Sequence, residues 1–451
     1  MKYAPQNRKW KALGVAAMTV ISALRAAECE VFASAVEAAP SKGVFAFYYA
    51  SQLTPEELSW AKRFNLFVSG AVLPASQIQE LKRAGTKLFL YEWLTGFYLD
   101  VNGGNPTDNS WESLVHRGKS QWLLNPARPD PGPDGQNRAY YYDPFHPELR
   151  FGWAKRLAQA LHDSGYDGVF FDLVGSPSVP RDLLKIYDER HADISYDQAL
   201  AGFLRSLKRL RPEALLFANQ GYRIPESYLP SADYDLSESL MTSYAWGEHV
   251  RIYVDGEGLV EKQESFYRPW EELKRHVELI TADIRRENPE LKIYHLNYVN
   301  PLYAPTGRTE TIEGREYPVF RMETDRPAIY FGYVAAKLWG HESYSPAPQA
   351  MRFGQDDIYF VELGKPLGDR YEERDGLVVR YYEKGVVALN PSGQKQSSDL
   401  ASRLIPPAVD RLFDCYAGNI QQGFRVTLEP TVSPASGRTY PAGRVYLYRT
   451  P

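Results

Sequence analysis

The octapeptide GYDGVFFD, residues 165–172, decides the fold class. It combines a glycine that ends a helix, a tight turn, and four small or apolar residues that lead to Asp172. A short apolar run of this kind is typical of a parallel strand that is buried on both faces. Asp172 would then lie at the carboxyl end of the strand, where parallel sheets and barrels place functional side chains. The alternative is an aspartate that only caps the following loop.

The same pattern of a short strand followed by a helix repeats from residue 43 onward. We predict eight strands, at residues 44–49, 66–70, 88–92, 168–172, 215–219, 234–238, 293–297 and 340–343. Helices between them have recognisable caps, such as Thr54 with Pro55 and Glu57. Eight such units indicate a (β/α)8 TIM barrel over residues 43–350. The competitor, a doubly wound open sheet, is disfavoured because no glycine-rich phosphate loop follows the first strand.

Two further features complete the predicted architecture. Long connections follow the third, sixth and seventh strands, all at the carboxyl face of the barrel, where they would shape a cleft. Beyond residue 355 the helical period disappears, and short strands separated by Gly, Pro and Ser predict a small antiparallel β-sandwich domain over residues 355–451. Its predicted strands are residues 358–363, 377–382, 386–390, 424–428 and 445–448.

The composition excludes some classes of partner. The 451 residues include 52 Lys and Arg against 56 Asp and Glu, a net charge of -4. This balance gives no positive field for nucleic acid or an anionic membrane surface. Aromatic residues make up 14% of the chain, with 32 Tyr and 9 Trp, which favours a ligand with flat apolar faces. We expect a monomer that binds a carbohydrate polymer or oligosaccharide.

The first 35 residues have the layout of a secretory signal peptide. A basic region at residues 2–11 precedes an apolar stretch at residues 12–24 and small residues that end at Ala35. The apolar stretch has roughly half the length of a membrane-spanning helix, so we expect no membrane attachment after cleavage. The protein would be secreted or periplasmic. Cleavage after Ala35 leaves Cys415 as the one thiol, which excludes an intramolecular disulfide.

Polar residues stand at the ends of several predicted strands. They are Glu92, Asp172, Asn219, Glu238, Asn297 and Glu342. A purely structural barrel has no reason to collect acids and amides at its strand ends, because each must be desolvated or hydrogen-bonded. Two carboxylates that face each other can cleave a glycosidic bond, one as proton donor and the other as nucleophile or base. We predict that Asp172 and Glu238 are this pair.

Glu238 has competitors within ADYDLSES, residues 232–239. Period-two alternation puts Tyr234, Leu236 and Glu238 on one face of the strand. Asp235 then faces the helices and needs a partner. A bulge near Ser237 would reverse this assignment.

Other polar and aromatic side chains near the strand ends are candidates to bind the substrate. They are Tyr48, Glu92, Asn219, Tyr222, Trp246, His295 and Asn297. A structural ion pair explains Glu92 equally well. We expect no metal and no cofactor, because the eight His are dispersed and the sequence has no HExxH motif. The sequence also has no GxSxG motif of a serine hydrolase.

Two stretches resemble a known family: YYYDPFHPELRFGWAKRLAQALHDSGYDGVFFD, residues 140–172, and ADYDLSES. They are similar to the glycoside hydrolase-like barrels related to family 114, the endo-α-1,4-polygalactosaminidases. The segments GLVVRYYEKGVVALNPS (376–392) and GRVYLYR (443–449) are similar to the β-sandwich that closes such glycosidases. The resemblance covers most of residues 43–451. It implies that Asp172 and Glu238 are catalytic, and that the substrate is an amino-sugar exopolysaccharide.

Two other classes of function stay open. A non-catalytic carbohydrate-binding or exopolysaccharide-assembly protein can retain a degenerate glycosidase barrel, since fold does not fix function. A secreted deacetylase or lyase would need a metal or a basic catalytic group, and the sequence offers no clear example of either.

Overall fold

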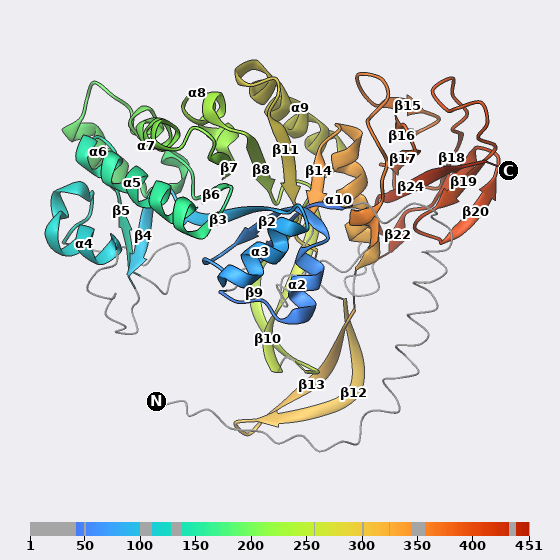
Figure 1. Ribbon diagram of the computed structural model, residues 1–451. Coiled ribbons are helices and arrows are strands. Elements are labelled where there is room, and N and C mark those ends of the chain that lie inside the picture. Colours follow the sequence, from blue (N-terminus) through green and yellow to red (C-terminus); the bar gives the residue numbers. More distant parts are fainter. Residues whose placement is uncertain are drawn as a thin grey trace.

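The computed structural model describes residues 42–48, 51–99, 111–127, 138–256, 258–299, 302–323, 325–344, 357–432 and 439–450. The predicted signal peptide, residues 1–35, lies outside them. Within the described residues, the chain forms a nearly closed parallel barrel with surrounding helices, followed by a β-rich part (Figure 1). The predicted TIM barrel is therefore confirmed.

The barrel contains all eight predicted strands. They are β1 (Gly43–Tyr48), β2 (Phe64–Ser69), β3 (Lys87–Trp93), β6 (Gly168–Asp172), β7 (Leu215–Asn219), β8 (Tyr234–Glu238), β11 (Lys292–Leu296) and β14 (Glu342–Tyr344), in this order around the sheet. The first and last strands lie side by side, and the ring centroids of Phe45 and Tyr344 are 5.6 Å apart. The bounds of β6, β7 and β8 match the prediction.

Helices follow the strands and cover the barrel. They are α2 (Pro55–Ala61), α3 (Ala75–Arg83), α5 (Pro147–Ser164), α6 (Arg181–Arg190), α7 (Tyr196–Leu210), α8 (Pro225–Tyr228), α9 (Trp270–Glu287) and α10 (Arg326–Leu338), with 3₁₀ turns η1 (Ser120–Trp122), η2 (Ser176–Ser178), η3 (Gly221–Arg223) and η4 (Leu229–Ser231). The predicted capping box of α2 is present, with Thr54 and Glu57 each bonded to the other's backbone. Because these signals are local, the sequence predicts them well.

The octapeptide at residues 165–172 forms the turn and strand expected of it. Gly165 ends α5 with φ 76°, a left-handed conformation that glycine adopts freely. Asp167 accepts a 2.9 Å hydrogen bond from the backbone N–H of Leu88 and so ties the turn to β3. A Cβ atom at Gly168 would lie 2.2 Å from the carbonyl oxygen of Leu215. Only glycine therefore allows β6 to approach β7 this closely.

Aromatic rings fill the barrel and reveal which side chains point inward. The ring of Phe45 contacts Phe217 and Tyr294, with centroid distances of 6.1 and 5.0 Å. Because β1 is not adjacent to β7 or β11 in the sheet, these rings meet in the interior. Phe170 also contacts Phe217, at 5.0 Å. By the period of two, Asp172 and the last residue of β7 also point inward.

Three insertions follow β3, β8 and β11. The first contains β4 (Gly96–Leu99), α4 (Trp111–Gly118) and β5 (Arg138–Tyr141); the second is the hairpin β9 (Thr242–Val254) and β10 (Gly258–Tyr267); the third is the hairpin β12 (Leu302–Ile312) and β13 (Arg315–Glu323). The two hairpins pair through β9 and β13 into one four-stranded sheet, which we call the arm. The arm projects away from the barrel (Figure 1). These segments were expected as long connections, not as paired strands.

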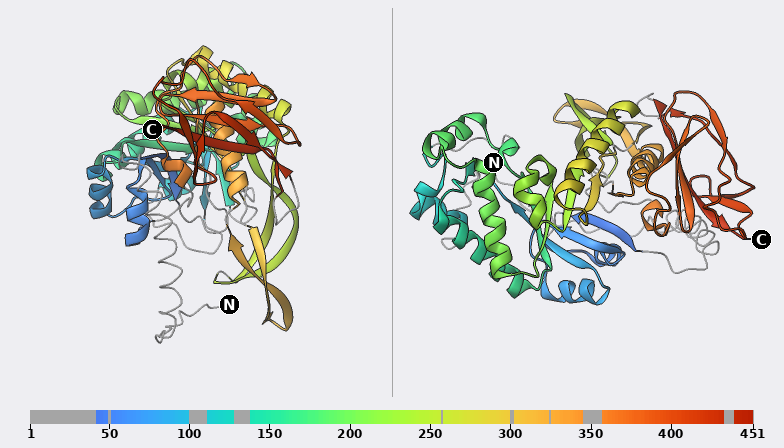
Figure 2. Two further views of the ribbon diagram at one scale, coloured as in Figure 1. Left: turned by 90° about the vertical axis from the view of Figure 1, so that its right-hand side faces the viewer. Right: turned by 90° about the horizontal axis from the view of Figure 1, so that it is seen from above.

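The C-terminal part is β-rich, as predicted, and lies beside the barrel (Figure 2). Its main antiparallel sheet has the order β15 (Glu372–Arg374), β16 (Leu377–Tyr382), β17 (Gly385–Asn390), β24 (Ala442–Arg449), β19 (Arg411–Asp414) and β20 (Asn419–Gln422), with two small sheets, β18 (Gln396–Asp399) with β21 (Arg425–Leu428) and β22 (Thr431–Val432) with β23 (Thr439–Tyr440). One face packs against α10, so Val387 and Val445 join the core of the barrel. The other face covers a second core with Val379 and Val426.

One C-terminal strand prediction is wrong. Residues 358–363 were expected as a strand, but η5 (Asp357–Phe360) is a 3₁₀ turn. The ring centroid of Phe360 in this turn lies 5.2 Å from that of Phe64 and 3.6 Å from the guanidinium carbon of Arg63. Packing against the barrel thus overrides the strand propensity of this apolar segment.

Candidate active site

The ends of β6, β7 and β8 bring Asp172, Asn219 and Glu238 into contact. The side-chain amide nitrogen of Asn219 donates a 3.0 Å hydrogen bond to Asp172 Oδ1 and also donates to Glu238 Oε2. Because one nitrogen contacts both oxygens, these oxygens lie no more than about 6 Å apart. All three side chains are partly exposed. The two carboxylates that the sequence singled out therefore form a close, accessible pair.

Two tyrosines hold the pair from opposite sides. Tyr91, on β3, donates a 2.6 Å hydrogen bond to Asp172 Oδ2. Tyr298, just after β11, donates a 2.6 Å hydrogen bond to Glu238 Oε1. The backbone N–H of Leu173 adds a 2.8 Å bond to Asp172 Oδ1. Asp172 thus accepts three hydrogen bonds, which fix the orientation of its carboxylate.

The surroundings of Glu238 favour its protonated form. Burial raises the pKa of this carboxyl group, and the nearby charge of Asp172 raises it further. The hydrogen bonds from Tyr298 and Asn219 and the charge of Arg223 lower the pKa, but burial is the larger effect. A carboxylic acid with a raised pKa beside a hydrogen-bonded carboxylate is the arrangement that separates the roles of acid and base.

The backbone is strained directly after each of the three contacting side chains. The following residues are Leu173, Gln220 and Ser239, with φ values of 51°, 60° and 57°. They are three of the five non-glycine residues with positive φ in the part of the chain that the structure describes. Such conformations are costly for residues other than glycine and gather at functional sites. Their position independently marks the ends of β6, β7 and β8.

Two of the expected substrate-binding residues point towards the helices instead. Glu92 forms an ion pair with Arg156 of α5, and burial raises the pKa of its carboxyl group. This placement favours the structural ion pair for Glu92. Tyr48 donates a hydrogen bond to Glu57, and its ring contacts Trp60 on α2 at 6.1 Å. Neither side chain is at the pair, because each directly follows an inward-facing residue of its strand.

Three further expected residues, His295, Asn297 and Tyr222, also lie apart from the pair. His295 is buried, with Nε2 2.9 Å from His341 Nδ1, and Asn297 donates a 2.9 Å hydrogen bond to Ser343. Burial raises the pKa of Tyr222, which lies near Ser237 on the outer face of β8. Trp246 lies in β9, and its side chain is outside the described part of the structure. Of the seven candidates, only Asn219 is shown at the pair.

Asp235, the competitor of Glu238, points away from the pair as the alternation required. It is fully buried, and its Oδ1 accepts a 2.7 Å hydrogen bond from the backbone N–H of Gly221. Burial raises its pKa well above the ordinary value. No bulge reverses the assignment, because β8 pairs in regular register with β11 from Tyr234 to Glu238.

The sequence analysis missed Tyr91 and Tyr298. Tyr91 has a signal in the sequence: it is two residues after the inward-facing Phe89, so alternation turns it towards the interior. Tyr298 has no such signal. It follows the end of β11 and reaches Glu238 of the neighbouring strand, a contact that depends on the three-dimensional path of the loop.

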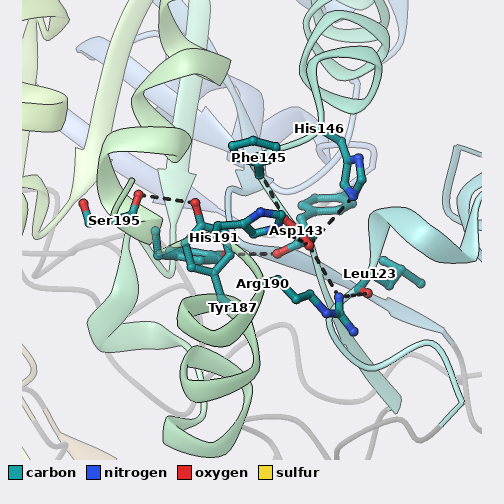
Figure 3. A network of polar contacts seen from close by, with 10 residues as sticks. Leu123, Asp143, Phe145, His146, Tyr187, Arg190, His191 and Ser195 are labelled. Atoms are coloured by element: carbon teal, nitrogen blue, oxygen red, sulfur yellow. Dashed lines mark hydrogen bonds and ion pairs between the residues drawn. The ribbon is translucent and has the colours of Figure 1, made fainter. Parts of the chain in front are cut away.

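The stretch at residues 140–150 contributes a second polar cluster, around Asp143 (Figure 3). This fully buried carboxylate has Oδ2 3.0 Å from His191 Nε2, 3.4 Å from Arg190 Nη1 and 3.8 Å from His146 Nε2. The ring of Phe145 stacks on His191 at 4.1 Å. The cluster fastens the insertion after β3 to the turn between α6 and α7.

Two further observations concern the described residues as a whole. The described residues contain no group of three or more His, Cys, Asp or Glu placed to hold a metal ion. No helix among the described residues is long and apolar enough to cross a bilayer.

A cavity of about 670 Å³ lies at the amino-terminal mouth of the barrel, opposite the carboxylate pair, and is lined by residues such as Lys87 and Lys292. The carboxylate pair is at the carboxyl ends of the strands, and that cavity does not contain it.

No protein-family model matches this sequence, and no curated protein matches it. Solved structures similar to it include the glycoside hydrolase domain of PelA from Pseudomonas aeruginosa, with 20% identity, 70% of this chain and 98% of that chain covered, and a TM-score of 0.44. Another is the alpha-amylase from Geobacillus thermoleovorans, with 11% identity, 90% of this chain and 98% of that chain covered, and a TM-score of 0.46. A third is the cyclic alpha-maltosyl-(1→6)-maltose hydrolase from Arthrobacter globiformis, with 12% identity, 92% of this chain and 100% of that chain covered, and a TM-score of 0.48. At these identities, the activities in those names belong to those proteins. The relation to family 114 stays a prediction.

Proposed function

We propose that this protein is a glycoside hydrolase in which Asp172 and Glu238 cleave the glycosidic bond. The observation that carries the proposal is the Asn219 amide, which donates to both carboxylates and fixes them as one unit. Most glycosidases use two carboxyl groups on either side of the scissile bond. The alternative is a non-catalytic carbohydrate-binding or assembly protein on the same barrel.

Glu238 is the proton donor in this proposal. Its raised pKa favours retention of a proton on the carboxyl group, and that proton passes to the leaving oxygen as the bond breaks. Tyr298 fixes the orientation of the carboxyl group through Oε1.

Asp172 is the nucleophile. Its hydrogen bonds from Tyr91, Leu173 and Asn219 orient both oxygens of its carboxylate. A separation of about 6 Å or less leaves no space for a water molecule between nucleophile and sugar, and supports a retaining mechanism through a covalent glycosyl-enzyme. Glu238 then deprotonates the water that hydrolyses this intermediate.

The proposed substrate is an amino-sugar exopolysaccharide, and the proposed location is the periplasm or the exterior of the cell. The resemblance of residues 140–172 and 232–239 to family 114 supports the substrate, and the layout of residues 1–35 supports secretion. We further propose that the protein is a monomer and needs no cofactor.

The test is a screen of the purified mature protein against purified exopolysaccharides, with analysis of the products. The expected result is depolymerisation of a galactosamine-containing polysaccharide, with retention of the anomeric configuration in products followed by NMR. Binding of a polysaccharide without product formation would support the non-catalytic alternative. Products of inverted configuration would contradict the assignment of Asp172 as nucleophile.

A further inference from the structure

The arm has one face with a hydrophobic cluster and one face with half-buried tyrosines. Val319 of β13 pairs with Tyr253 of β9, and Phe320 pairs with Val254. Because side chains alternate along a strand, these two pairs lie on opposite faces of the sheet. The face of Val254 is buried: Ile252 and Tyr303 share its hydrophobic cluster, against which Val260 and Phe320 pack.

The opposite face, which we call the open face, carries aromatic and polar side chains beside Val319, which is buried. Tyr253 and Tyr317 on this face are half-buried, and Tyr317 is two residues from Val319, so the two tyrosines are diagonal neighbours. Glu310 is exposed and pairs directly with Tyr317 across the hairpin. The exposed Arg251 also lies on this face. A sheet surface with partly exposed tyrosine rings and charged neighbours is suited to stacking against and hydrogen bonding a sugar chain.

The arm grows directly out of the candidate active site. Its first strand begins at Thr242, four residues after Glu238. The backbone N–H of Ser239 donates a 2.8 Å hydrogen bond to Leu296, and that of Tyr298 donates a 3.3 Å bond to Thr242. The same Tyr298 holds Glu238 through its hydroxyl group. A strand of 13 residues such as β9 extends on the order of 40 Å, several times the size of the pair.

The charge of the arm indicates the class of its ligand. Residues 242–267 and 302–323 contain nine Asp and Glu, at positions 248, 255, 257, 261, 264, 310, 313, 316 and 323, against five Lys and Arg, at positions 251, 262, 308, 315 and 321. This excess of acids disfavours nucleic acid and anionic lipid. It favours a polymer with positive charges, such as a polysaccharide with free amino groups.

We propose that the open face of the arm binds the part of an amino-sugar polysaccharide that extends beyond the carboxylate pair. This inference rests on the proposed function for the identity of the polymer. It adds a binding surface outside the site of bond cleavage. The surface would raise the affinity for long chains and leave short ones unaffected, because only a long chain reaches both the pair and the arm.

The test is the double variant Tyr253→Ala/Tyr317→Ala, measured in an Asp172→Asn background that prevents hydrolysis. The probes are a polymer of α-1,4-linked galactosamine and a galactosamine disaccharide. We expect the double variant to bind the polymer about tenfold more weakly, because two ring contacts are lost, and to bind the disaccharide unchanged. The matched control is Phe151→Ala, which removes an aromatic ring that is 56% exposed on α5. Circular dichroism and the melting temperature check that each variant is folded.

The outcomes separate the arm from the proposed function. Equal affinity of the double variant and its background for the polymer would overturn the inference about the arm, and so would absence of any polymer binding. The double variant could bind the polymer more weakly while the wild-type protein cleaves no polymer. That result would support polymer binding by the arm and contradict the proposed hydrolysis. A Glu310→Gln variant tests the charge argument: it should weaken binding of the galactosamine polymer and leave binding of the neutral, fully N-acetylated polymer unchanged.

Discussion

The side-chain amide of Asn219 lies 3.0 Å from the carboxylate of Asp172 and donates a hydrogen bond to it. The same nitrogen donates to Glu238, so one neutral side chain separates two acidic groups that would otherwise repel each other. Their surroundings differ: Asp172 accepts three hydrogen bonds, and burial raises the pKa of Glu238. This asymmetry is the physical basis for the different roles that we propose for them.

Replacement of Asn219 should impair catalysis more than folding. Asn219→Ala removes a hydrogen bond that lowers the pKa of Glu238 and leaves the repulsion from Asp172 unshielded. The pKa of Glu238 should therefore rise, and the alkaline limb of the profile of kcat/KM against pH should move to higher pH, because Glu238 acts as an acid. We expect kcat to fall roughly 100-fold through loss of alignment. An unchanged profile with unchanged kcat would show that Asn219 does not organise the pair.

Removal of the Tyr298 hydroxyl should also move the alkaline limb of the profile of kcat/KM against pH to higher pH. Tyr298→Phe deletes a hydrogen bond that lowers the pKa of Glu238 and keeps the ring. The measurement is the pH profile of polysaccharide hydrolysis. The matched control is Tyr48→Phe, which deletes a hydroxyl bonded to Glu57 on the helix side of β1 and should leave the profile in place. A shift in the control as large as in Tyr298→Phe would contradict a specific role for Tyr298.

The buried pair of His295 and His341 predicts a loss of stability at acid pH. Burial lowers the pKa of His295 to about 3 and that of His341 well below 6.5. Below pH 6.5 the unfolded chain takes up protons that the folded chain does not, so the free energy of unfolding falls as the pH decreases towards 3. Each histidine contributes up to about 1.4 kcal/mol per pH unit in this range.

Denaturant unfolding between pH 7 and pH 4 checks this prediction. His295→Gln removes one titrating group and should reduce the slope of the free energy of unfolding against pH, whatever its effect at pH 7. As a control, His162→Gln replaces a histidine outside the barrel core, on the last turn of α5. An equal slope in wild type and His295→Gln would show that the buried pair does not govern acid stability.

The left-handed conformation at Gln220 predicts that glycine stabilises this position. With φ 60°, Gln220 carries a steric cost that glycine avoids. We expect Gln220→Gly to have a free energy of unfolding about 1 kcal/mol higher than Gln220→Ala, which keeps the Cβ atom. Chemical denaturation of both variants checks the difference. If Gln220→Ala is as stable as Gln220→Gly, the backbone after Asn219 is not strained.

The barrel was predictable because its signals are local. The eight strands are short apolar runs, and helix caps such as Thr54 and Gly165 mark their boundaries. The arm was not predictable in the same way. Its sheet depends on a pairing between Tyr253 and Val319, which lie 66 residues apart in the sequence, and no local period records such a contact.

The site was predictable where the alternation of the strands was used. The alternation of side chains along β8 correctly predicted that Glu238 faces Asp172 and that Asp235 faces the helices. Phe47, Tyr91 and Tyr294 face the interior of the barrel. The same rule therefore predicts that the residues directly after them face outward; these are Tyr48, Glu92 and His295. The position of a residue at a strand end is thus insufficient by itself, because every second side chain faces the helix layer. Tyr298 lies beyond its strand, and the rule does not reach it.

The hydrolysis rate of three single variants tests the central claim most directly. Asp172→Asn and Glu238→Gln each remove one member of the pair, and Asp235→Asn removes a buried carboxylate on the opposite face of β8. Reducing ends released from the galactosamine polymer are measured for all three, together with the melting temperature. We predict that Asp172→Asn and Glu238→Gln lose hydrolysis and stay folded, and that Asp235→Asn retains it. Turnover at the wild-type rate in Asp172→Asn or Glu238→Gln would contradict the catalytic pair.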